Sequence, residues 1–148
     1  MLNIIADSKG SSFMTKAKTR CTNGAARRRV LAWLRSQEFP CWICRLSIDY
    51  SLGGGHRWGM VGDELIPFSL GGSPYTRDNV APAHWCCNSW RGAKSVEYVR
   101  ALQYLVFDVY QYRPRTPDEF IALCKMLEKQ QMDVQKSKVN QIKSSTEW

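Results

Sequence analysis

Apolar residues recur at helical spacing over residues 25–37, which predicts a helix with one side packed on a core. The residues that would face this core are Val30, Trp33 and Leu34. Residues 58–66 are typical of a strand that ends before a proline. Asp63 and Glu64 are neighbours on this strand, so we expect their side chains to point to opposite faces.

Two more helices are expected further along the chain. Apolar residues form a helical stripe between Val96 and Val106. A later helix should begin with Thr116 as its N-cap, followed by Pro117 at the first helical position and Glu119 three residues after the cap. The inward face of this helix would consist of Phe120, Leu123 and Leu127. Helices combined with one short stretch of strand predict an α+β fold.

Both ends of the chain are polar and lack sustained apolar periodicity. We expect a flexible basic arm over residues 1–24, a single domain over residues 25–128 and a polar tail over residues 129–148 that frays into disorder. The chain has 148 residues, of which 44% are hydrophobic, and such a chain can bury one modest core. This composition agrees with a single domain.

The positive charge is concentrated in the first part of the chain. The formal net charge is +8, and residues 1–94 contain 13 Lys or Arg against 6 Asp or Glu, whereas residues 95–148 contain 8 against 7. This distribution favours a polyanionic partner. No apolar run approaches the roughly 20 residues that a membrane-spanning helix needs, and the start of the sequence lacks the features of a secretory signal. We therefore expect a cytoplasmic protein without membrane association.

The chain has six cysteines, which could form disulfides in a secreted protein. Because the sequence lacks a secretory signal, the paired spacing of the cysteines favours metal binding instead. Cys41 and Cys44 form a CxxC pair, whose thiolates can both reach one zinc ion at about 2.3 Å. A CxxC pair can also be redox-active, but that function requires a neighbouring βαβ pattern, which the sequence lacks. A second group of potential ligands, His84, Cys87 and Asn88, lies on a separate segment.

The order of these features is more specific than any one of them. In chain order they are the CxxC pair, Asp63-Glu64 ahead of a proline, Gly71-Gly72, Asp78-Asn79 and the segment from His84 to Asn88. This order resembles the HNH endonuclease family, also known as ββα-metal or His-Me finger nucleases. The resemblance covers residues 41–94 and implies a zinc-stabilised ββα finger with flanking α-helices.

The resemblance also implies the ligands of a structural zinc ion. Where zinc-bearing members of the family have a second CxxC pair, this chain has His84 and Cys87. The implied ligands are Cys41, Cys44, His84 and Cys87, and zinc accepts such a Cys3His shell. Cys86 is the competing ligand, which the local turn geometry would direct elsewhere. Some relatives without the zinc pair use a histidine four residues before the last metal ligand to hold the catalytic ion, and His84 and Asn88 have this spacing.

A catalytic cation is implied as well. Asp63 and Asn88 match the two metal-binding positions of the family, and their oxygen ligands suit Mg²⁺ or Mn²⁺. Asn79 matches the asparagine that orients the base or braces the loop. Glu64 occupies the position of the histidine that usually deprotonates the attacking water. We favour Glu64 as the general base. Alternatively, Glu64 binds metal beside Asp63 while His56 or water transfers the proton. In a third alternative, the substitution marks a site that has lost nuclease activity.

The implied function is a divalent-metal-dependent DNA endonuclease that hydrolyses phosphodiester bonds, either by nicking or by double-strand cleavage. The expected phosphate contacts are Arg77, Arg91 and Lys94 around the site and Arg27 and Arg28 on the first helix. A basic face that is merely solvated is the alternative. Compact chains of this type resemble phage-encoded HNH nucleases, some associated with genome packaging, and also restriction-like nucleases. The resemblance thus implies packaging or restriction proteins as partners. The competing hypothesis is a non-catalytic zinc module that binds nucleic acid or protein.

Overall fold

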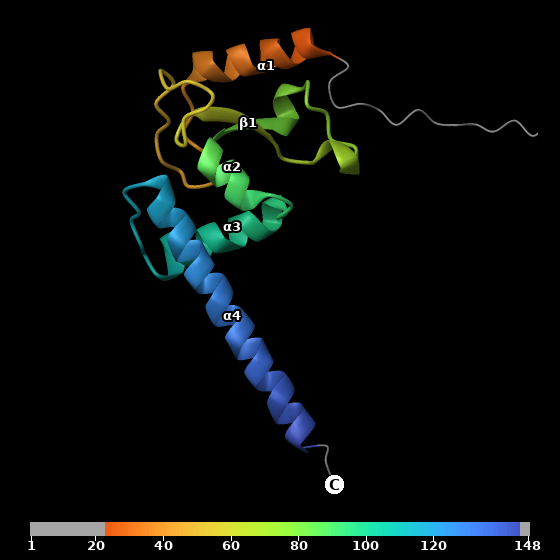
Figure 1. Cartoon of the computed structure of the whole chain (residues 1–148), viewed down its shortest axis with the longest axis vertical. Coiled ribbons are helices and arrows are strands. Elements are labelled where there is room, and N and C mark those ends of the chain that lie inside the picture. Colours follow the sequence, from red (N-terminus) through yellow and green to blue (C-terminus); the bar gives the residue numbers. More distant parts are fainter. Residues whose placement is uncertain (1–22, 146–148) are drawn as a thin grey trace, which may run out of the picture.

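A small antiparallel sheet lies between helix α1 on one side and helix α2 on the other (Figure 1). The helices and strands are α1 (Gly24–Gln37), β1 (Met60–Glu64), β2 (Val80–His84), α2 (Trp85–Arg91), α3 (Val96–Tyr104) and α4 (Pro117–Ser145). This computed structural model describes residues 23–145, so the arm expected over residues 1–24 lies almost entirely outside the described residues. The mixture of helices with a two-stranded sheet confirms the expected combination of α and β structure. Among the described helices, none has the length and apolar character needed to cross a membrane.

Helix α1 begins and ends as its sequence predicts. The side-chain oxygen of Asn23, the N-cap, accepts a hydrogen bond from the backbone N–H of Ala26 at 3.0 Å. The helix ends at Glu38, which adopts the left-handed conformation with φ of 50°. Val30 and Leu34 are buried, so the apolar face of the helix packs on the core as expected.

A glycine in β1 sets the distance between the sheet and α1. β1 pairs with β2 in a register that places Glu64 opposite Val80. A Cβ atom on Gly62 would lie 2.6 Å from Cδ2 of Leu31 on α1 and 2.9 Å from Cγ1 of Val80. Only glycine therefore allows α1 to pack this closely on the strand.

The side chains of β1 alternate between the two helices, as expected for neighbours on a strand. The carboxylate of Glu64 lies 3.9 Å from the guanidinium of Arg27 on α1. The carboxylate of Asp63 instead accepts hydrogen bonds from Arg91 on α2. Each of the two adjacent acidic residues thus has a basic partner on a different helix.

The side chain of Asn79 holds the loop that follows β1. Its Oδ1 atom accepts a hydrogen bond from the backbone N–H of Ile66 at 2.8 Å, and its Nδ2 atom donates to the carbonyl oxygens of Ile66 and Ser73. The backbone carbonyl of Asn79 accepts from the N–H of Leu65 at 2.9 Å. Gly72 lies against this network, because a Cβ atom there would be 1.8 Å from the carbonyl oxygen of Ile66.

The last helix has the expected N-cap but is longer than predicted. Thr116 Oγ1 accepts a hydrogen bond from the N–H of Glu119 at 3.2 Å, and Phe120 and Leu127 are buried. The sequence predicts disorder beyond residue 129, whereas α4 continues to Ser145 and extends away from the rest of the chain (Figure 1). The added length follows from the composition, because this segment has many Lys and Gln residues, which favour helix, and contains no Gly or Pro.

We expect Gly72→Ala to lower the free energy of unfolding by about 3 kcal/mol, because the added methyl group would displace the backbone that Asn79 holds. Urea unfolding followed by circular dichroism measures this change. Gly54→Ala is the matched control: a Cβ atom at Gly54 has no neighbour within 4 Å. It should change stability by less than about 0.5 kcal/mol. Equal, small effects of both substitutions would contradict the tight packing of this loop.

Candidate metal centre and adjoining cavity

The two cysteines of the CxxC pair lie on a turn that is bonded both to itself and to the sheet. The backbone N–H of Cys41 donates to the carbonyl of Leu46 at 2.9 Å, and the N–H of Arg45 donates to the carbonyl of Cys41 at 2.9 Å. The N–H of Trp42 donates to the carbonyl of Pro82 on β2 at 3.0 Å. These bonds hold Cys41 and Cys44 beside the end of β2, where both are buried.

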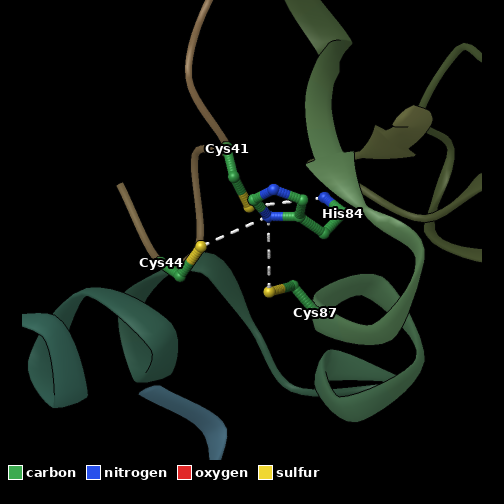
Figure 2. A group of neighbouring side chains, drawn as sticks. All are labelled: Cys41, Cys44, His84 and Cys87. Atoms are coloured by element: carbon green, nitrogen blue, oxygen red, sulfur yellow. Dashed lines mark hydrogen bonds between the residues drawn. The ribbon is translucent and has the colours of Figure 1, made fainter. Parts of the chain in front are cut away.

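The other two potential ligands come from the junction between β2 and α2. His84 is the last residue of β2, and Cys87 lies three residues later on α2, so both side chains point toward the CxxC turn (Figure 2). The ligand atoms of Cys41, Cys44, His84 and Cys87 all lie within 4.8 Å of one another. Nδ1 of His84 is 3.4 Å from Sγ of Cys44 and 4.0 Å from Sγ of Cys87.

These separations match a tetrahedral zinc site. Zinc–sulfur bonds of about 2.3 Å and zinc–nitrogen bonds of about 2.0 Å at tetrahedral angles place neighbouring ligands roughly 3.5 to 3.8 Å apart. The four buried residues can therefore hold a zinc ion without a large rearrangement. The structure brings together all four ligands that the sequence predicts.

A hydrogen bond donated by the ring of His84 selects the nitrogen that can bind metal. Nε2 of His84 lies 3.2 Å from the carbonyl oxygen of Ser47. A carbonyl oxygen can only accept, so Nε2 carries the proton and the lone pair lies on Nδ1, which faces the cysteines. His84 thus belongs to the cysteine group and is not among the residues that line the neighbouring cavity.

The thiols of the group cannot all ionise without a cation. Burial raises the pKa of Cys41, but hydrogen bonds with Cys44, Cys87 and His84 outweigh burial and bring that pKa well below its usual value. The pKa values of Cys44 and Cys87 are raised, mainly by their hydrogen bonds with Cys41. A divalent cation would stabilise the three thiolates together, so the group favours metal binding and should release protons on binding. Cys86 is buried but does not belong to this group, and burial raises the pKa of its thiol.

A cavity of about 410 Å³ lies beside the metal centre, between β1 and α2. Its lining includes Asp63 and Glu64 from the end of β1, the turn Pro67–Ser69, and Asn88 and Arg91 from α2. Three residues to which the sequence assigns catalytic roles, Asp63, Glu64 and Asn88, thus share one cavity. Asn79 does not line the cavity but braces the loop from which the turn projects.

The carboxylate of Asp63 is bonded to two neighbouring side chains. Both of its oxygens lie 2.7 Å from Nη1 of Arg91, and its Oδ2 atom accepts a hydrogen bond from Nε1 of Trp42 at 2.8 Å. Burial raises the pKa of Asp63, although Arg91 and Trp42 act in the opposite direction. The pair is desolvated, since Asp63 is 6% exposed and Arg91 is 3% exposed.

The sequence predicts that Arg91 points outward to a phosphate. In the structure its side chain instead points toward the sheet. Besides its contact with Asp63, its guanidinium donates to the backbone carbonyls of Glu64 and Leu65, each at 2.8 Å. These bonds tie α2 to the end of β1. Arg91 is buried because position 91, in the last turn of a short helix, faces the sheet and not the solvent.

Sequence reasoning missed Trp42 and Gln103, which support the site from the CxxC turn. Trp42 bonds to Asp63, and the guanidinium of Arg91 lies over its ring at 5.1 Å from the centroid. Nε2 of Gln103, a buried residue of α3, donates to the carbonyls of Trp42 and Ile43 at 2.6 and 2.7 Å. The sequence signal that could have identified Gln103 is its position as a polar residue beside the apolar stripe of α3.

The remaining predicted contact residues have different surroundings. Arg27 is partly buried and donates to the carbonyls of Gly62 and Pro74 at 2.7 and 2.9 Å, whereas Arg28 is exposed. Arg77 is exposed and lies 4.8 Å from the centroid of the Trp33 ring. Of the predicted contacts, Arg28 and Arg77 are thus the ones presented most openly to a partner.

Two further residues have local partners outside the cavity. Lys94 donates from Nζ to the carbonyl of Trp90 at 2.9 Å and lies over the ring of that residue. His56 is exposed, and its Nδ1 atom accepts a hydrogen bond from the N–H of Trp58 at 3.1 Å. His56 does not line the cavity, so the structure does not bring it to the acidic residues.

Comparison of the chain with protein-family models, with curated proteins and with solved structures finds no match.

We expect the purified chain to contain one tightly bound zinc ion, because four buried ligands surround a single point. Cys41→Ser should lose this ion, and Cys86→Ser should retain it. Mass-spectrometric metal analysis of protein purified without chelator measures the content. Zinc-free wild-type protein, or zinc lost from Cys86→Ser but kept by Cys41→Ser, would contradict the ligand assignment.

Arg91→Met should lower the free energy of unfolding by about 3 to 5 kcal/mol, because it leaves the buried Asp63 without its charged partner. Arg28→Met, an exposed change on α1, should cost less than about 0.5 kcal/mol. Adding Asp63→Asn to Arg91→Met should restore part of the loss, since no buried charge then lacks a partner. Denaturant unfolding of these zinc-loaded variants tests the set, and an Arg91→Met loss no greater than that of the control contradicts the proposed clamp.

Proposed function

We propose that this chain is a divalent-metal-dependent nuclease of the HNH type that hydrolyses phosphodiester bonds in DNA. One observation carries the proposal: Asp63, Glu64 and Asn88 line a single cavity between β1, the turn at residues 67–69 and α2. A group able to bind zinc lies at the junction of β2 and α2. The order of the motifs in the sequence supports this proposal.

Asp63 and Asn88 would hold the catalytic cation. A carboxylate and an amide are hard oxygen donors, and Mg²⁺ or Mn²⁺ commonly takes its remaining ligands from water and from a substrate phosphate. Oδ1 of Asp63 accepts one hydrogen bond, from Arg91, and so retains acceptor capacity. The residues therefore fit a cation, although Arg91 competes with it for the carboxylate. When bound, such a cation would polarise the scissile phosphate and stabilise the leaving oxygen.

Glu64 is the proposed general base. It is 8% exposed, its Oε2 atom accepts from the N–H of Phe68 at 3.3 Å, and Arg27 lies 3.9 Å from its Oε1 atom. These neighbours hold the carboxylate in the lining of the cavity, where it would accept a proton from an attacking water. The alternative with His56 as the base has less support, because His56 lies outside the cavity and bonds to its own loop.

DNA is the proposed substrate because of the positive charge of the chain. The net charge is +8, and α1 carries four arginines and no acidic residue. The proposed setting is the cytoplasm of a bacterium or of a phage-infected host, with packaging or restriction proteins as partners.

A second candidate function is a non-catalytic zinc module that binds nucleic acid or protein. The bonds from Arg91 and Trp42 to Asp63 favour it, because they satisfy most of the carboxylate that would otherwise bind the cation. In this alternative the acidic residue is a structural anchor. We place it second because it does not account for the presence of Asp63, Glu64 and Asn88 in one cavity.

We expect the zinc-loaded chain to nick supercoiled plasmid in Mg²⁺ or Mn²⁺. Asp63→Asn should abolish nicking, because it removes the charge that attracts the cation, and Glu64→Gln should lower the rate about 100-fold or more by removing the base. Glu97→Gln, an exposed change on α3, is the matched control and should not affect the rate. Gel quantification of nicked plasmid over time measures these rates.

The variants must retain wild-type zinc content and melting temperature for this comparison. Nicking unaffected by both Asp63→Asn and Glu64→Gln would exclude the proposed site. Folded, zinc-loaded wild-type protein that binds DNA without cutting it would favour the second candidate.

A further inference from the structure

The short helical turn Phe68–Leu70 forms a ridge between two cavities. One is the cavity of about 410 Å³ that contains Asp63, Glu64 and Asn88. The other, of about 490 Å³, is lined on the far side of the turn by residues 71–75. Phe68 and Ser69 line both cavities, so the turn separates them.

The backbone of this ridge is firmly held. Gly71 closes the turn with φ of 90°, and its N–H donates to the carbonyl of Phe68 at 3.0 Å. The N–H of Gly72 donates to the carbonyl of Pro67 at 3.1 Å. Asn79 fixes both ends of the loop through Ile66 and Ser73. The ridge is therefore pre-organised rather than shaped by a partner.

The ridge carries an apolar side chain in an unusual position. Leu70 is 76% exposed, the largest exposed fraction among the large apolar side chains whose burial the structure describes. Ile66, at the base of the same loop, is 54% exposed. An isolated exposed leucine needs no explanation by itself, but this one lies at the end of a rigid turn beside the candidate catalytic cavity.

The charge around the ridge selects the class of partner. Arg27 of α1 bonds to the carbonyl of Pro74 in this loop, which places α1 directly beside it. The neighbouring Arg28 and Arg29 are exposed, as is Arg77 at the end of the loop. An exposed apolar tip, on a loop that contacts a helix with exposed guanidinium groups, suits a partner with apolar planar faces and phosphates, which is a nucleic-acid duplex.

We propose that Leu70 is a wedge that enters a duplex between two base pairs and unstacks them next to the bond to be cut. This inference rests on the proposed nuclease function and assigns a substrate-positioning residue to it. An apolar wedge kinks the duplex and brings more of its backbone onto the protein. The ridge would then direct one strand into the cavity with Asp63 and Asn88, while the second cavity receives the displaced base step.

The test uses short duplexes that each carry 2-aminopurine at a different step, because this base fluoresces more strongly when it is unstacked. Binding is measured without added divalent cation, so that the duplex stays intact. The wild-type chain should increase the fluorescence at one or more steps. Leu70→Ala should lose most of this increase and bind about tenfold more weakly. Leu70→Met, which keeps an apolar tip, should retain both properties.

Val109→Ala is the matched control, because Val109 is an apolar residue, 49% exposed, in the turn after α3. It should behave as wild type, and all variants should keep their zinc content and melting temperature. Unstacking by Leu70→Ala equal to that by the wild type overturns the wedge. If cleavage depends on Asp63 but occurs without unstacking, the wedge is overturned and the proposed nuclease function stands. If unstacking occurs without cleavage, the wedge is supported and the proposed nuclease function is overturned.

Discussion

The buried Cys3His group is the interaction on which the rest of the structure depends. It joins the CxxC turn at residues 41–44 to the junction of β2 and α2, which is 40 residues further along the chain. The sheet has only two strands, and a two-stranded sheet is marginally stable by itself. A metal ion bound to four side chains would fix the direction in which α2 leaves β2. The position of Asn88, one residue after a ligand, follows from that direction.

A second network uses the same elements and sets the properties of the cavity. Arg91 joins α2 to the end of β1, and Trp42 of the CxxC turn bonds to the same carboxylate of Asp63. These bonds hold the side chains of the cavity in place without any ligand. Such rigidity would favour the precise positioning of a bound substrate. The bonds also engage the oxygen atoms that a catalytic cation would need. In our proposal, the balance between Arg91 and a cation at Asp63 would decide between the proposed nuclease and the proposed binding module.

The order and spacing of the motifs, through the family resemblance, predicted the metal ligands, and local patterns predicted the bounds of α1 and the start of α4. The CxxC pair and the interval from His84 to Cys87 limit which side chains can meet at one point, and Thr116 is recognisable as an N-cap. The role of Arg91 could not be predicted in this way. Whether a basic residue at a helix end faces solvent or a buried carboxylate depends on how α2 lies on β1, which is a tertiary property.

The long C-terminal helix was missed for a related reason. Lys and Gln residues are typical both of disordered tails and of exposed helices, so composition does not separate the two. Trp42 was visible in the sequence only as a residue between two cysteines. Its bond to Asp63 depends on the sheet register and on the packing of the CxxC turn against Pro82.

X-ray absorption at the zinc edge tests the central claim most directly, because it reports the atoms bound to the metal in the folded protein. The structure predicts three sulfur ligands at about 2.3 Å and one nitrogen ligand at about 2.0 Å. His84→Cys should change this pattern to four sulfur ligands. A wild-type spectrum with four sulfur ligands, or one dominated by oxygen, would contradict the proposed centre and the geometry of the cavity that depends on it.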